Sequence, residues 1–327
     1  EPYTAEGEID DEKNGLLIDA GQLMPFVDKV VFLLEKEQTS YWNKFLQGYY
    51  DVSGISSDSF EQAIQVGSGG EFGLSDEMAK KGVALRTAIG TSTYYMGFNM
   101  QDEVVGGLSD AAKKLRQAIS IAIDYEEYIS IFLNGRGIAA QGPIPPGIFG
   151  YEVGKAGVNS YVYQWEDERL QRQSIEQAKS LLVEAGYPEG REVKTGEPLT
   201  LYLDVPASGP EARATFDWLR KQFQKLGIQL VVRSTDYNRF QDKMRSGQAQ
   251  LFQWGWNADY PDPENFFFLL YGPNSKASYS GENAANYNNP EFDRLFEQMK
   301  VMPNTVERQV LINNMLAIIR EDSPWIW

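Results

Sequence analysis

Three carboxylates stand among aromatic side chains in the stretch FQWGWNADYPDPENFFF, residues 252–268. Two of them, Asp259 and Asp262, are three positions apart with Pro261 between them. A lone carboxylate is costly to bury beside apolar rings, so it needs a cation or hydrogen-bond donors. Two interpretations follow: the acids shape a turn, or one of them pairs with a positively charged ligand.

The composition excludes several kinds of catalytic site, metal site and cross-link. The chain contains neither histidine nor cysteine, which excludes a His-based triad, an imidazole metal site, a thiolate nucleophile and a disulfide. A direct metal site would need oxygen ligands only. We therefore expect no metal and no cofactor.

The charge balance indicates the class of partner. The formal net charge is −16, which repels phosphate backbones and anionic headgroups, so we expect no nucleic-acid partner. Cationic or zwitterionic solutes fit better. No window of about 18 apolar residues is present to span a bilayer. The chain begins EPYTAEGEIDDEK, without a signal-peptide pattern, and we interpret it as a mature product or an excised piece.

A strand-helix-strand pattern precedes the acidic stretch. The segment 199–205 alternates as a strand does, a helix is predicted from Pro210 to Leu226, and 228–234 predicts a second strand. Such a unit implies a right-handed crossover and parallel strands. A third strand, 249–256, leads into the acids. We expect the three strands in one sheet, with the acids at their carboxyl ends, where ligands bind in open α/β sheets.

Periodicity and capping residues predict the remaining elements. Strands are expected at 28–35 and 92–100, and a short helix, a turn and a strand within 41–52. The Gly-rich segment 67–73 predicts a loop, since no Lys-Ser/Thr follows it. Helices are predicted from Asp110 with Ser109 as cap, after a capping box of Ser174 and Gln177, over 288–300, and from Thr305 to about Glu321. Arg116 and Lys179 are expected on solvent-facing helix positions.

The order of these signals resembles the substrate-binding proteins of bacterial peptide and nickel ABC transporters, the oligopeptide- and dipeptide-binding family. The resemblance covers roughly residues 25–327. The matching motifs are YYMGFN at 94–99, LRQAISIAID at 115–124, AKSLLVEAGY at 178–187, LGIQLVVRS at 226–234, GWNADYPDPENFF at 255–267 and NYNNPEFDRL at 286–295.

The resemblance implies an α/β fold, the periplasmic-binding-protein-like (type II) two-lobed fold. Residues 1–98 would be part of the first lobe, and 99–327 the second lobe with its ligand-binding face. Family members carry further N-terminal and C-terminal segments, so the chain resembles a fragment lacking them. The implied protein is no enzyme but a monomeric receptor that passes short peptides to ABC-transporter permease subunits. Its implied location is periplasmic or extracytoplasmic, with a lipid anchor as an alternative in the full-length protein.

The resemblance also assigns site residues, position by position. Asp259 would pair with the α-ammonium of a peptide, Gly255 and Asn257 would offer backbone groups, and Trp256 would line the cleft. Three tyrosines complete the set of candidates: Tyr237, Tyr94 and Tyr95. The sequence leaves open which of the last two faces the cleft.

Other readings of the same residues stay open. Asp262 is expected to cap the turn or the helix beginning near Glu264, Asp259 has a structural alternative as an acceptor of local N–H groups, and 266–270 is expected to be core. Relatives with the same fold bind sugars, opines, nickel complexes or haem. Two other classes of function also stay open. One is a glycosidase using Asp259 and Asp262 as a carboxylate pair, and the other is a receptor or scaffold that contacts only another protein.

Overall fold

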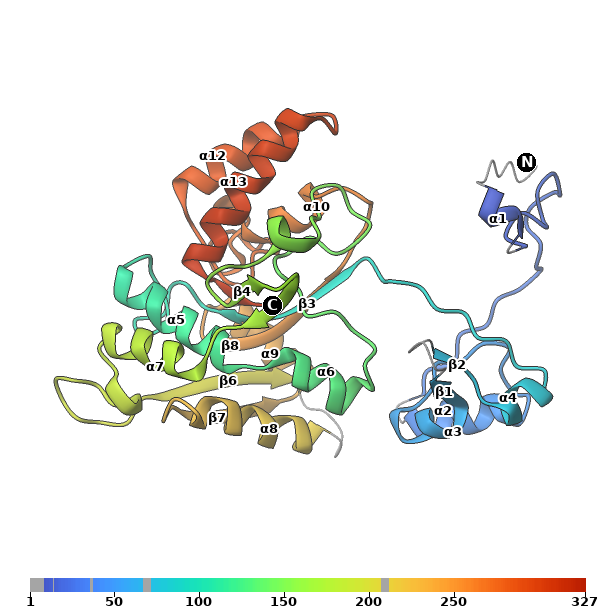
Figure 1. Ribbon diagram of the computed structural model, residues 1–327, viewed down its shortest axis with the longest axis horizontal. Coiled ribbons are helices and arrows are strands. Elements are labelled where there is room, and N and C mark those ends of the chain that lie inside the picture. The colour runs from blue at the N-terminus through green and yellow to red at the C-terminus, as the bar shows by residue number, and fades with distance from the viewer. Residues whose placement is uncertain (1–8, 14, 36–37, 67–71, 207–211) are drawn as a thin grey trace. The chain divides into compact units, whose positions relative to one another are not determined.

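The computed structural model describes residues 9–13, 15–35, 38–66, 72–206 and 212–327 (Figure 1). It forms two compact units, Glu1–Leu85 and Arg86–Trp327. The division falls earlier than the one expected after residue 98. The reason is that the strand at 92–98 pairs within the sheet of the larger unit.

The smaller unit has a modest apolar cluster built on Trp42, Phe60 and Met78. Strands β1 and β2 pair as an antiparallel two-stranded sheet. Its elements are α1 (Ile9–Lys13), α2 (Gln38–Leu46), η1 (Ser57–Ser59), α3 (Phe60–Ala63), β1 (Ile64–Val66), β2 (Phe72–Leu74) and α4 (Asp76–Lys80).

Two strands expected in this unit do not form. Residues 28–35 have no regular structure, and Phe32 and Leu34 are 91% and 90% exposed. The second half of 41–52 is also irregular after α2 ends. β-Branched and aromatic residues favour strands only where a partner strand is present. The predicted loop 67–73 lies mostly outside the described residues, and its last two positions belong to β2.

The larger unit is organised around a five-stranded sheet in the order β7-β6-β8-β3-β9. Strand β6 runs parallel to β7 and β8, whereas β3 is antiparallel to β8 and β9. The strands are β3 (Ser92–Phe98), β6 (Thr200–Pro206), β7 (Gln229–Thr235), β8 (Leu251–Asn257) and β9 (Trp325–Ile326). The prediction of one sheet holding the strands near 199–205, 228–234 and 249–256 is therefore confirmed.

Helices and one hairpin pack around this sheet, with α12 beside α13 and α5 beside α7 (Figure 1). The side chains of Ser109, Ser174 and Thr305 accept capping N–H groups, as predicted. The helices are α5 (Asp110–Ala122), α6 (Tyr125–Leu133), α7 (Ile175–Glu184), α8 (Ala212–Gln224), α9 (Tyr237–Arg245), α10 (Glu264–Phe267), α11 (Lys276–Tyr279), α12 (Pro290–Met299) and α13 (Val306–Asp322). The hairpin is β4 (Tyr163–Glu166) with β5 (Arg169–Arg172), and short 3-10 turns are η2 (Gly154–Gly157), η3 (Pro188–Gly190), η4 (Phe268–Leu270) and η5 (Gly272–Asn274).

The prediction for Arg116 is wrong. Its side chain is buried, and the guanidinium donates to the carbonyls of Val105 and Asp322. Burial lowers its pKa to about 10, so it stays charged at neutral pH. The prediction put this residue on the solvent side of the helix, because a cationic side chain is normally hydrated. Here three hydrogen bonds to backbone carbonyl oxygens replace that hydration. Lys179 is exposed, as predicted.

Candidate functional site

Asp262 fixes the loop that follows β8. One carboxylate oxygen accepts the backbone N–H of Glu264 at 2.9 Å, which confirms the predicted cap. The guanidinium of Arg308, a buried residue of α13, donates to both oxygens at 2.7 and 2.8 Å. Burial acts to raise the pKa of Asp262, but the hydrogen bonds from Arg308 and Glu264 outweigh it and hold the pKa below its usual range. Asp262 is therefore an anchored anion.

Asp259 lies differently from Asp262. It is exposed, although aromatic residues flank it in the sequence. Its backbone N–H donates to Oδ1 of Asn265 at 2.8 Å, and Nδ2 of Asn265 reaches Oδ2 of Asp259 at 3.3 Å. Among the described residues, no cationic side chain pairs with it. The structure therefore presents a held carboxylate to solvent.

The register of β3 and β8 divides the other candidates between two faces of the sheet. Residues directly opposite in an antiparallel pair share a face. Tyr94 lies opposite Gly255, and Ser92 lies opposite Asn257, to which its hydroxyl donates at 2.7 Å. The ring of Tyr94 covers Gly255 so closely that a Cβ there would lie 2.4 Å from it. Tyr94, Gly255 and Asn257 thus share one face.

Tyr95 belongs to the opposite face and is a core residue. It is 3% exposed and its ring stacks on Trp325 with centroids 3.6 Å apart. Burial raises its pKa far above the usual value. Tyr94, by contrast, is 71% exposed. Of the two tyrosines, Tyr94 is the one that a solute can reach.

Trp256 shares the face of Tyr95 but is only half-buried. Its ring packs edge-on against Phe268, and its Nε1–H donates to Asn265 Oδ1 at 3.1 Å. The run 266–270 is core, as expected, except that Phe268 is half-buried. The indole is therefore positioned by the same amide that holds Asp259.

Tyr237 approaches from another element. It is the first residue of α9, directly after the capping residue Asp236, and is 62% exposed. Helix α9 follows the carboxyl end of β7, and Asn257 ends β8. These two strands both run parallel to β6, so their carboxyl ends lie at one edge of the sheet. The structure thus brings Tyr237, Asn257 and Asp259 to the same edge.

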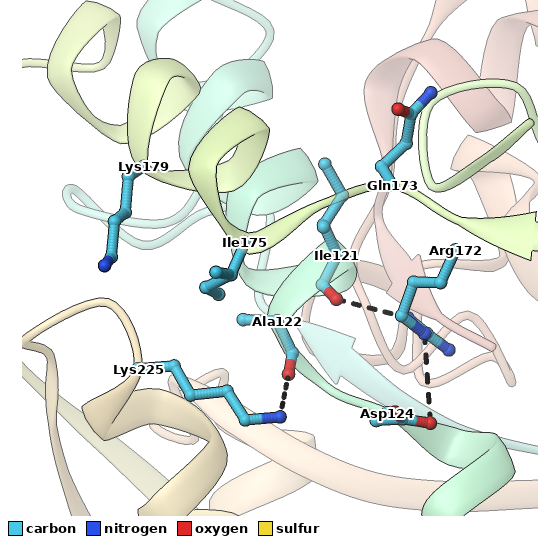
Figure 2. A pocket seen from close by; sticks show the side chains of 8 residues that line it. All are labelled: Ile121, Ala122, Asp124, Arg172, Gln173, Ile175, Lys179 and Lys225. Carbon is cyan, nitrogen blue, oxygen red and sulfur yellow. Dashed lines mark hydrogen bonds and ion pairs between the residues drawn. The ribbon is translucent and has the colours of Figure 1, made fainter.

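A pocket in the described part of the chain lies elsewhere (Figure 2). It has a volume of about 480 Å³, and none of the candidate residues lines it. Its lining comes from the end of α5, β5, the start of α7 and the residue after α8. The lining residues are Ile121, Ala122, Asp124, Arg172, Gln173, Ile175, Lys179 and Lys225.

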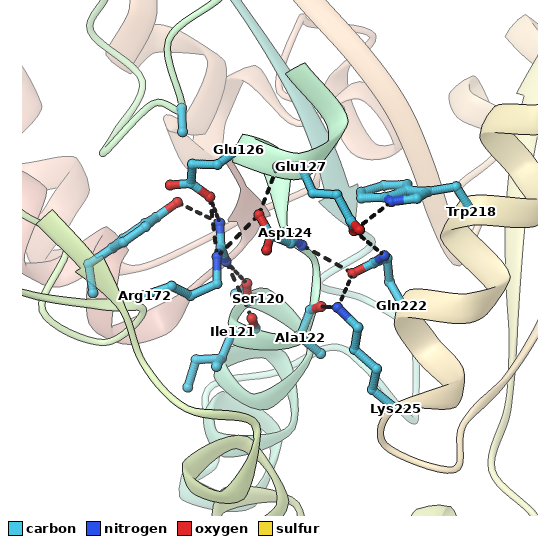
Figure 3. A network of polar contacts seen from close by, with 12 residues as sticks. Ser120, Ile121, Ala122, Asp124, Glu126, Glu127, Arg172, Trp218, Gln222 and Lys225 are labelled. Carbon is cyan, nitrogen blue, oxygen red and sulfur yellow. Dashed lines mark hydrogen bonds and ion pairs between the residues drawn. The ribbon is translucent and has the colours of Figure 1, made fainter. Parts of the chain in front are cut away.

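Two cations of this pocket hold the carboxyl end of α5 (Figure 3). Arg172 donates to the carbonyls of Ser120 and Ile121 and pairs with Glu126 at 2.6 Å, while Lys225 reaches the Ala122 carbonyl at 3.5 Å. Cations stabilise the carboxyl end of a helix because its last carbonyls lack intrahelical donors. This network is therefore a structural junction between α5 and its neighbours.

The described residues contain no group of three or more acidic side chains placed to hold a metal ion. None of the helices they form has the length and apolar character needed to cross a membrane.

Residues 21–278 match the family model described as bacterial extracellular solute-binding proteins, family 5 Middle. The chain belongs to this family. The resemblance stated from the sequence is thereby confirmed, and the family is one of solute-binding proteins located outside the cytoplasm by its description.

Curated relatives within family 5 have low sequence identity to this chain over long alignments. Heme-binding protein A of Haemophilus influenzae is 27% identical, over 72% of this chain and 39% of that protein. The dipeptide-binding protein of Escherichia coli is 24% identical, over 75% of this chain and 41% of that protein. The chain thus spans about two fifths of the length of these relatives.

Solved structures confirm the fold. The periplasmic binding protein DppA of Helicobacter pylori, in complex with the peptide STSA, has a TM-score of 0.70 at 19% identity, over 94% of this chain and 52% of that one. The dipeptide-binding protein of Pseudoalteromonas sp. SM9913, in complex with Met-Leu, has a TM-score of 0.64 at 24% identity. The match covers 89% of this chain and 50% of that one. The chain therefore has the α/β fold of the two-lobed periplasmic binding proteins and covers about half of it.

Proposed function

We propose that this chain is part of a non-catalytic receptor for short peptides and carries its ligand-binding face. The observation that carries the proposal is the Asp259 carboxylate, which is exposed, held by Asn265 and left without a cation among the described residues. It lies in a member of a solute-binding family whose solved relatives include peptide complexes. A peptide's ammonium supplies the missing partner.

Each candidate then has a role. Asp259 accepts a charge-assisted hydrogen bond from the α-ammonium. Backbone groups at Gly255 and Asn257 bind the peptide main chain, which serves any sequence. The rings of Tyr94, Tyr237 and Trp256 contact side chains. Tyr95 supports the sheet from the core.

The same proposal extends to the complete protein. Arg86–Trp327 corresponds to the second lobe and Glu1–Leu85 to part of the first. The receptor works as a monomer with the permease subunits of an ABC importer, in the periplasm or another extracytoplasmic compartment, with or without a lipid anchor.

A carboxylate-pair hydrolase fits the geometry poorly. A glycosidase needs one carboxyl group that stays protonated near neutral pH. The ion pair with Arg308 holds the pKa of Asp262 below its usual range, so Asp262 stays ionised. It cannot serve as the general acid, and the two hydrogen bonds from Arg308 occupy both of the oxygens that a base or nucleophile would use.

Mass spectrometry of solute released from the purified full-length protein tests the function. We expect short peptides with free N-termini, which titration calorimetry should then show to bind again. Recovery of a sugar, an opine, a nickel complex or haem, with no peptide binding, would replace the peptide assignment. Hydrolysis of glycosides would contradict the non-catalytic one.

A further inference from the structure

The side chain of Asn265 connects three parts of the candidate site. Its Oδ1 accepts from the indole Nε1–H of Trp256 at 3.1 Å and from the backbone N–H of Asp259 at 2.8 Å. Both partners can only donate. Turning the amide around would place its NH₂ group against two N–H groups, so this orientation is set by the partners.

The fixed amide orientation has a consequence for the Asp259 carboxylate. With Oδ1 of Asn265 turned to its two donors, Nδ2 points to Oδ2 of Asp259 at 3.3 Å. Oδ1 of Asp259 has no partner among the described residues, and the residue is exposed. One oxygen is thus held from inside the protein while the other faces solvent.

Asn265 itself has little freedom to move. It is 2% exposed and lies in α10. The two residues that follow it in this helix, Phe266 and Phe267, are fully buried. The turn before the helix is fixed by Asp262, through Glu264 and Arg308. The amide therefore transmits the rigidity of the core to an exposed acid.

We propose that Asn265 is a positioning residue, which orients the Asp259 carboxylate toward the ammonium of a bound peptide. The proposal rests on the peptide-receptor function given above and adds a residue to it. A carboxylate already held in its binding geometry loses less conformational entropy when the ligand arrives. Asn265 needs no contact with the ligand to have this effect.

A purely structural role for Asn265 makes a different prediction. If the amide only stabilised the loop, its loss would weaken all peptides alike. If it positions Asp259, its loss weakens peptides with a free ammonium and spares those without one. The ratio of the two dissociation constants separates the roles.

The experiment uses the full-length protein, with trialanine and N-acetyltrialanine as probes for titration calorimetry. In the wild type we expect the acetylated peptide to bind about thirty-fold more weakly or worse, the ratio for about 2 kcal/mol. Asn265→Ala should reduce that ratio by about tenfold and change the affinity for the acetylated peptide by less than about twofold. Asn274→Ala is the matched control, because Asn274 donates to the Phe268 carbonyl at 3.1 Å and does not bond Asp259. It should leave the ratio unchanged.

A second variant covers the case in which Asn265→Ala fails to fold. Asn265→Asp has the same shape and keeps both acceptor bonds, but an ionised carboxylate has no donor for Oδ2 of Asp259. The ratio of the two dissociation constants should then fall as it does in Asn265→Ala, and the affinity for the acetylated peptide should change by less than about twofold. A folded Asn265→Asp variant that keeps the wild-type ratio would overturn the proposal.

The outcomes separate the two proposals. A wild-type protein that does not distinguish the two peptides would refute the function and this inference together. A wild type that distinguishes them, with Asn265→Ala keeping the full ratio or weakening both peptides equally, would refute the positioning role alone.

Discussion

At the scale of single residues, two acids three positions apart have separate tasks. Asp262 is held by Arg308 and by the N–H of Glu264, whereas Asp259 is exposed and held only by Asn265. Turn chemistry in the sequence predicted the cap at Asp262. It could not predict Arg308, which lies 46 positions away on another helix, because nothing local marks a pair formed by tertiary packing.

Asp259→Asn tests the acid that faces solvent. In the full-length protein it should weaken peptide binding by about 2 kcal/mol, the low end of the loss for a buried charge pair, because Asp259 is exposed before the ligand covers it. Acetylating the peptide should cause the same loss in the wild type and add little in the variant, because both changes delete one interaction. Calorimetry on the four combinations measures this, and additive losses would show that Asp259 and the ammonium do not meet.

Asp262→Asn should act on stability, with little effect on affinity. Removing the charge opposite buried Arg308 should lower the free energy of unfolding by about 1–3 kcal/mol at pH 7, less than for a fully buried pair because Asp262 is partly exposed.

The pH dependence of this loss has a defined sign. The folded pKa of Asp262 lies below its unfolded value, so its contribution is present above the unfolded pKa near 4 and is lost as pH falls through the folded pKa. The difference between variant and wild type should therefore shrink below about pH 4. Urea unfolding at several pH values measures it, and a difference that grew in acid would contradict the pair.

At the scale of elements, alternation and caps predicted β3, β6, β7 and β8 of the sheet and the helices α5, α7, α8, α12 and α13, but neither β9 nor α6. The predicted strands form because each has a partner within the chain. The segment 28–35 is a strand prediction that fails. Its apolar run predicts a strand, yet no described strand pairs with it. The split of Tyr94 and Tyr95 between two faces required the register with β8. Period-two alternation alone gives opposite faces without saying which one is core.

Two glycines test the packing of β3 on β8. A Cβ at Gly97 would lie 2.2 Å from the ring of buried Phe252, whereas a Cβ at Gly255 would lie 2.4 Å from the ring of exposed Tyr94. The first ring cannot move within the core and the second can turn into solvent. Gly97→Ala should therefore destabilise the protein by about 1–3 kcal/mol, as overpacking does, and Gly255→Ala by clearly less. Equal losses in urea unfolding would refute this account.

At the scale of the whole molecule, the sequence indicated a two-lobed receptor, and motion between lobes is the expected response to a ligand. The aromatic strand at 94–99 is one candidate for the hinge. In the structure β3 is paired on both sides, and the pairing continues through a bond from the Ala258 N–H to the Thr91 carbonyl at 2.9 Å. Bending there would break ladder hydrogen bonds. Residues 86–90 have no regular structure, so a rotation of the backbone there breaks no ladder hydrogen bonds.

The last prediction places the hinge in that segment. In the full-length protein, peptide should shift the population toward a closed form, so small-angle scattering should give a smaller radius of gyration at saturating trialanine. Asp259→Asn at the same peptide concentration should stay near the unliganded radius, because it binds less peptide. Amide hydrogen exchange should be fast at 86–90 and slow at 94–98, since only the second of these segments is paired in the sheet. Slow exchange at 86–90 with fast exchange in β3 would return the hinge to the strand. An unchanged radius with bound peptide would mean that the receptor holds its ligand without closing.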